Sequence, residues 1–135
     1  MSTTVIIPTY GRHPVTDNPL PTLLQSLSAL SKKDFKVVII NSTEDKTHNI
    51  TTARYLDKLI KKYKKHFPIA HYGFDALDRI HSAFQRLEFT EFKHYVCFDN
   101  YATFRNVGLI IASLLDTKII IFLDDDEIVD VMVKA

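Results

Sequence analysis

The sequence predicts an α/β domain whose mostly parallel sheet is flanked by helices. Short runs of β-branched and aliphatic residues, typical of buried strands, recur along the chain. Between them lie longer stretches in which apolar residues recur every three or four positions, the spacing of an amphipathic helix. Alternation of strands with helices favours parallel pairing, because parallel neighbours are joined by a crossover that is usually a helix.

The first half of the chain shows this alternation clearly. Residues 4–7 (Thr-Val-Ile-Ile) read as a buried strand halted by Pro8, so we expect a loop from Pro8 to Arg12. Five leucines on one face predict a helix over residues 20–30. Residues 36–40 (Lys-Val-Val-Ile-Ile) predict a second buried strand that ends at a polar cluster beginning with Asn41.

The second half repeats the pattern up to an acidic cluster. We expect helices at residues 51–66, 75–86 and 103–115, a short strand at 68–73, and no clear element at 88–97. Residues 119–123 (Ile-Ile-Ile-Phe-Leu) are the most apolar stretch and read as a buried strand. Asp124-Asp125-Asp126-Glu127 follows it directly.

Composition narrows the class of protein. A chain of 135 residues suits one domain, residues 1–135, with one core. A net charge of +1 gives no sign of a nucleic-acid-binding surface, and the single cysteine, Cys97, excludes a disulfide framework and a cysteine-rich zinc site. No secretory signal and no apolar stretch of roughly 20 residues is visible, so we expect a cytoplasmic protein without a transmembrane segment. The lysine pairs at 61–62 and 64–65 leave association with a membrane surface open.

The acidic cluster is the strongest chemical signal in the sequence. Unit charges about 4 Å apart repel by roughly 4 kcal/mol at an intermediate dielectric constant, so three desolvated aspartates would favour a bound cation. In an extended segment Asp124 and Asp126 point to the same side and offer hard oxygen ligands suited to Mg²⁺ or Mn²⁺. The alternative is a solvated acidic loop that caps a following helix.

Two other protein classes place aspartates after an apolar strand, and neither fits. A P-loop ATPase needs an upstream G-x-x-x-x-G-K-[ST] motif, but none of Gly11, Gly73 and Gly108 precedes a lysine. A phosphoryl-accepting receiver domain places its acidic pair after the first strand, whereas the first strand here ends in Pro-Thr-Tyr.

Three polar segments are expected at the same edge of the sheet. Residues 8–12, 41–45 and 124–127 each follow a predicted strand, and parallel sheets bind ligands beyond the carboxyl ends of their strands. In the first segment Arg12 suits a phosphate and Tyr10 suits a nucleobase. Arg105 lies early in the helix before the acidic strand, where an anion also meets the helix dipole.

Together these motifs resemble the amino-terminal half of a family 2 glycosyltransferase with the GT-A (Rossmann-like) fold. The resemblance rests on five segments that occur in the family's order across nearly the whole chain. They are Val5-Ile6-Ile7-Pro8-Thr9-Tyr10-Gly11-Arg12, the leucine-rich helix to Leu30, Val37-Val38-Ile39-Ile40, Arg105-Asn106-Val107-Gly108, and Ile120 to Glu127 with its Asp-x-Asp motif.

The resemblance implies a site for a nucleotide-diphosphate sugar, whose glycosyl group passes to an unknown hydroxyl acceptor, with inversion in the parent activity. It implies that Pro8, Thr9 and Tyr10 line the nucleobase pocket with Arg12 nearby. It places Asp124 or Asp125 near the ribose and donor sugar, and Arg105 near the base or phosphates. The metal, Mn²⁺ or Mg²⁺, falls to Asp126, with Asp124 as the second ligand expected from the spacing.

The chain departs from the family pattern in two places. Asn41 stands where family members usually have an aspartate that contacts the base, although its amide could still bond a base edge. The sequence ends nine residues after Asp126, before the segments that carry the family's general base and acceptor site. We therefore expect a donor-binding half, truncated after the Asp-x-Asp strand. The alternatives are a small nucleotide-binding or nucleotidyl-transferring protein and a non-catalytic module; the oligomeric state stays open.

Overall fold

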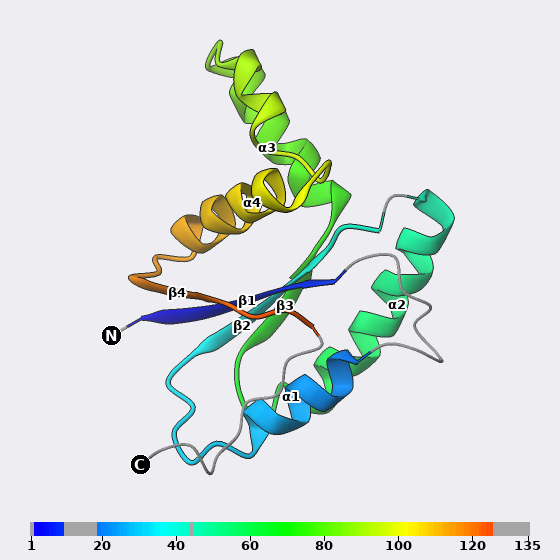
Figure 1. Cartoon of the computed structure of the whole chain (residues 1–135), viewed down its shortest axis with the longest axis vertical. Coiled ribbons are helices and arrows are strands. Elements are labelled where there is room, and N and C mark those ends of the chain that lie inside the picture. Colours follow the sequence, from blue (N-terminus) through cyan, green and yellow to red (C-terminus); the bar gives the residue numbers. More distant parts are fainter. Residues whose placement is uncertain (1, 10–18, 44, 126–135) are drawn as a thin grey trace.

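A computed structural model of the chain describes residues 2–9, 19–43 and 45–125. Figure 1 shows a central sheet with helices on both faces. Within the described residues the strands run parallel in the order β3-β2-β1-β4. Their bounds are Thr3–Thr9 (β1), Lys36–Asn41 (β2), Ile69–Tyr72 (β3) and Ile119–Phe122 (β4). The predicted α/β class with a parallel sheet is confirmed.

The helices divide between the two faces of the sheet. Helices α1 (Leu20–Ser28) and α2 (Lys46–Tyr63) cover one face, and α3 (Phe74–Arg86) and α4 (Tyr101–Leu114) lie on the other (Figure 1). A short 3₁₀ helix, η1 (Thr90–His94), occupies part of the stretch that had no clear pattern. None of these helices is both long and apolar enough to cross a membrane, as far as the described residues go.

The apolar spacing predicted that this helix begins near Thr51, but α2 begins at Lys46. The reason is a cap: the Asp45 carboxylate accepts hydrogen bonds from the backbone N–H groups of Thr47 and His48. Such a cap satisfies N–H groups that have no partner inside the helix. The first helical turns therefore form on polar residues that carry no apolar periodicity.

Two apolar layers hold the sheet between the helices. Successive residues of a strand point to opposite faces, so Val5 and Ile7 pack towards α1 and α2, whereas Ile6 packs towards α4. All three are at most 4% exposed, which explains why the inner strands are continuous apolar runs rather than alternating ones.

The boundary of β1 corrects one sequence-based expectation. Pro8 and Thr9 do not begin a loop but continue the strand, paired with Ile40 and Asn41. The carbonyl oxygen of Ile6 accepts a hydrogen bond from the N–H of Leu123, the first residue after β4. The backbone nitrogen of Pro8, two residues further along β1, points to the same side, where β4 has already ended. Its missing N–H group therefore costs no ladder hydrogen bond.

Strand β4 corrects a second expectation. Its apolar sequence predicted a buried strand, but it lies at an edge of the described sheet and ends at Phe122. Ile119 and Ile121 are 39% and 42% exposed. An apolar run alone indicates a strand and does not distinguish a covered position from an edge position.

The order of the strands places a topological switch point between β1 and β4. From β1 the chain moves outward through β2 to β3, and then returns across the other face to pair β4 with β1. In open parallel sheets ligands bind outside the carboxyl ends of the strands at such a point. Thr9, the last residue of β1, and Asp124 and Asp125, which follow β4, lie at this point.

Candidate functional site

A buried hydrogen bond joins the two strands at the switch point. The hydroxyl of Thr9, the last residue of β1, donates to Asp125 Oδ2 over 3.1 Å. Thr9 and Asp125 are 2% and 5% exposed. The two segments lie 116 residues apart in sequence, so the fold itself brings the end of the Pro8-Thr9 segment against the acidic motif.

The same edge includes the end of β2. The backbone N–H and the hydroxyl of Ser42 both donate to the carbonyl oxygen of Thr9, over 3.0 and 3.1 Å. The described parts of all three polar segments therefore lie together at the carboxyl edge, as the sequence predicted. A carboxylate that is buried there needs polar partners, and the Thr9 hydroxyl is one of them.

Asp124 and Asp125 differ in exposure although they are neighbours. Asp124 is exposed and accepts a hydrogen bond from the Tyr101 hydroxyl over 3.1 Å, whereas Asp125 is buried at a turn. The two side chains thus have different surroundings: Asp125 fastens the acidic segment to β1, and Asp124 presents a carboxylate to solvent.

Helix α4 supplies an aromatic and a cationic side chain to this edge. The side chain of Asn100 accepts from the N–H of Thr103, whose hydroxyl accepts from the N–H of Asn100, which fixes the start of the helix. Tyr101 and Arg105 follow at a spacing of four residues, on one helix face. The Arg105 guanidinium lies 4.6 Å from the ring centroid of Phe122 and 5.8 Å from that of Tyr101.

Cation–π contacts with Phe122 and Tyr101 orient Arg105. Its side chain is exposed and forms no salt bridge with any described residue. A guanidinium stacked on a ring keeps its N–H edge available, and that edge suits phosphate oxygens.

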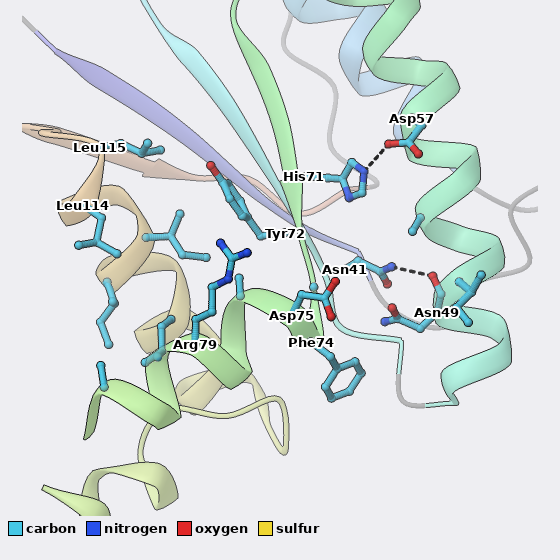
Figure 2. A pocket seen from close by; sticks show the side chains of 18 of the residues that line it. Asn41, Asn49, Asp57, His71, Tyr72, Phe74, Asp75, Arg79, Leu114 and Leu115 are labelled. Atoms are coloured by element: carbon cyan, nitrogen blue, oxygen red, sulfur yellow. Dashed lines mark hydrogen bonds and ion pairs between the residues drawn. The ribbon is translucent and has the colours of Figure 1, made fainter. Parts of the chain in front are cut away.

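Asn41 is held differently from the other predicted site residues. Its side chain is 1% exposed, its amide nitrogen donates to the carbonyl of Asn49 over 3.2 Å, and its amide oxygen accepts from the N–H of Thr43. Figure 2 shows it between the end of β2 and the start of α2. These bonds fix the loop after β2, and contact between Asn41 and a nucleobase stays a prediction.

Three predicted site residues lie outside the described residues: Tyr10, Arg12 and Asp126. Pro8 lies inside them, half-buried in β1. The structure thus brings together Thr9, Asp124, Asp125 and Arg105, and it adds Tyr101, which the sequence analysis missed. The signal that could have found Tyr101 is the capping pattern Asn100-x-x-Thr103, which starts the helix that leads to the acidic strand.

Carboxylate oxygens at this edge are the kind of ligand that a hard cation prefers, and the predicted ligand Asp126 lies outside the described residues. No group of three or more His, Cys, Asp or Glu side chains that could hold a metal occurs among the described residues. Asp124 is an exposed carboxylate at the switch point, and its oxygens match Mg²⁺ or Mn²⁺ in hardness. Asp125 is buried against Thr9, so it is the poorer candidate for a ligand.

Replacement of Thr9 by Val should lower the free energy of unfolding by about 1–2 kcal/mol, because a buried carboxylate loses a donor without a change of side-chain shape. Urea titration measures this. Thr4→Val on the same strand is the matched control, since the Thr4 hydroxyl is also buried and lies 2.6 Å from that of Thr117, away from the acidic edge. An unchanged stability in Thr9→Val would contradict a role of Thr9 in fixing Asp125.

The fold and site define a parallel α/β domain with an acidic, aromatic and cationic edge at its switch point. No family model and no curated protein matches the chain. Among solved structures, the crystal structure of S. aureus TarS matches 96% of this chain and 17% of its own length, with a TM-score of 0.46 and 18% identity. The chain thus spans about one sixth of TarS, and what it binds must be inferred from its own residues.

Proposed function

We propose that the carboxyl edge of β1 and β4 binds a nucleotide-diphosphate sugar with a divalent cation, as the donor site of a glycosyltransferase. The observation that carries the proposal is the Thr9–Asp125 hydrogen bond, which places the acidic segment at the switch point. This edge suits a nucleotide because aromatic, cationic and carboxylate side chains lie close together there.

Each described residue has a distinct part in this proposal. Thr9 and Asp125 hold the two strand ends together, and Asp124 faces the ligand. Arg105, kept in place by Phe122, contacts phosphate oxygens. Tyr101 orients the Asp124 carboxylate and presents a ring at the start of α4.

The remaining roles in ligand binding are assigned to residues outside the described ranges. Tyr10 and Arg12 would flank the base and phosphates, and Asp126 would hold Mn²⁺ or Mg²⁺ together with Asp124. When bound, such a cation neutralises the diphosphate and makes it a better leaving group. We assign no residue of this chain as the general base and propose no acceptor.

Isothermal titration with UDP, GDP and CDP, each with and without Mn²⁺, tests the donor site. We expect one of the three to bind in a one-to-one complex and to bind more tightly with Mn²⁺. Absence of binding by all three in both conditions would sink the proposal. Binding that Mn²⁺ does not strengthen would favour the alternative of a metal-independent nucleotide-binding module.

Incubation of the matching nucleotide sugar with the protein and Mn²⁺ separates an enzyme from a binding module. Slow release of the nucleoside diphosphate without an acceptor would show that the chain activates the glycosyl bond. Tight binding without release over the same time would identify a donor-binding domain that does not cleave its ligand.

A further inference from the structure

A hollow lies at the β3 edge of the described sheet, opposite the edge formed by β4. It has a volume of about 720 Å³ and runs along β3, an edge strand of the described sheet, between α2 on one side and α3 and α4 on the other. Figure 2 shows its lining. Of the described candidate site residues only Asn41 reaches it, so the hollow is largely separate from the edge at β1 and β4.

One part of this hollow is lined by apolar side chains. They come from facing positions of α3 and α4 and include Ile80, Ala83, Phe84, Ile110 and Leu114. Leu114 is 77% exposed and Leu87, also in the lining, is 62% exposed. Apolar surface that remains open inside a concavity of this size is typical of sites for small organic molecules, whose volumes run from roughly 300 to 1,000 Å³.

The other part carries charged side chains, namely two arginines (Arg54 and Arg79) and two aspartates (Asp57 and Asp75). The Asp57 carboxylate on α2 is engaged by His71 of β3, with Oδ1 and Nε2 2.7 Å apart. This leaves Arg54, Arg79 and Asp75 without an ion pair to any described residue. Figure 2 shows Arg79 reaching towards Tyr72, with the Asp75 side chain in a different part of the hollow.

We propose that this hollow binds an amphipathic organic anion, a single aliphatic chain that ends in a phosphate or carboxylate group. The chain lies between α3 and α4 against Ile80 and Ala83, and the anionic group is held by Arg79. The ligand enters as a dissolved molecule rather than as part of a bilayer, because the apolar surface is concave. This inference does not depend on the proposed nucleotide site.

Isothermal titration with decyl phosphate, below the concentration at which it forms micelles, tests the site. We expect one molecule to bind per chain, and octyl phosphate to bind about fifteenfold more weakly, because each buried methylene adds roughly fourfold to the affinity. Decyl trimethylammonium has the same chain with the opposite charge and should bind much more weakly. Equal binding of the cation and the anion would overturn the charge assignment.

Two pairs of variants locate the ligand. Arg79→Gln should weaken decyl phosphate by about tenfold, as expected for a lost charge-assisted hydrogen bond, whereas Arg86→Gln, an exposed arginine of the same helix outside the lining, should not. Ala83→Trp should block the chain, whereas Ser82→Trp, its exposed neighbour outside the lining, should leave binding unchanged. Unchanged binding in Ala83→Trp would place the ligand elsewhere.

A readout on the unmodified protein covers the case in which Ala83→Trp fails to fold. Titration of decyl phosphate into isotopically labelled protein should shift the methyl resonances of Ile80, Ile110 and Leu114. Shifts confined to Ile119 and Ile121 on β4 would contradict the proposal, as would the absence of any shift at saturating ligand.

Discussion

Replacement of Asp124 by Asn should abolish the difference between nucleotide affinities measured with and without Mn²⁺. The substitution keeps the shape of the side chain and its hydrogen bond to Tyr101, but it removes the charge that would hold the cation. Because Asp124 is exposed, the change should leave the thermal midpoint nearly unaltered. Isothermal titration with the nucleotide that binds wild-type protein, at matched Mn²⁺ concentrations, measures the effect.

The matched control is Asp34→Asn, which makes the same change of charge at an exposed position just before β2, at the opposite edge of the sheet. It should bind nucleotide as the wild type does. If Asp124→Asn keeps its metal dependence, the cation is held elsewhere. If Asp34→Asn loses it too, the effect is one of net charge rather than of a site.

Replacement of Gly108 by Val should lower the free energy of unfolding by about 2–3 kcal/mol and the thermal midpoint by roughly 10 °C. A Cβ atom at Gly108 would lie 3.1 Å from Phe122 Cε1 and 3.2 Å from Ile6 Cγ2. Both neighbours are packed side chains of β4 and β1, so the helix must move away from the two strands at the switch point. Circular dichroism during heating measures the loss.

The control for this prediction is Ser113→Val, which places the same β-branched residue at an exposed position of α4. It should cost little, because helix propensities of ordinary residues differ by at most about 0.7 kcal/mol. Weakened nucleotide binding in Gly108→Val is also expected, since Tyr101 and Arg105 move with the helix. A variant as stable as wild type would show that α4 does not pack closely on Phe122.

The strands and α-helices of the described chain follow from local patterns, and the sequence located each of them, whereas the short 3₁₀ helix η1 showed no such pattern. Leucine spacing in α1 indicates one helix face that must be buried. The apolar runs of β1 and β2 indicate strands that are buried on both faces. The errors lie where capping or pairing decides. Asp45 starts α2 earlier than its apolar residues do, and Pro8 stays in β1 because β4 ends beside it.

The sequence predicted the surroundings of the individual site residues less well than it predicted the fold. Asp124 and Asp125 are chemically identical in sequence, yet one is exposed beside Tyr101 and the other is buried against Thr9. That difference arises from a turn and from contacts across 116 residues. No spacing rule distinguishes the two, because the expectation of alternating sides holds only while the backbone stays extended.

By itself the sequence determined the alternation of strands and helices, the parallel sheet and the position of the acidic segment after an apolar strand, because each depends on residues near one another in the chain. Tertiary structure alone decided that β4 is an edge strand of the described sheet, that Tyr101 reaches Asp124, and that a hollow opens beside β3. These features depend on which strands pair and how helices lie over them. The pairing of strands and the placement of helices are determined by packing over the whole domain, and the conformational preferences of short segments do not specify them.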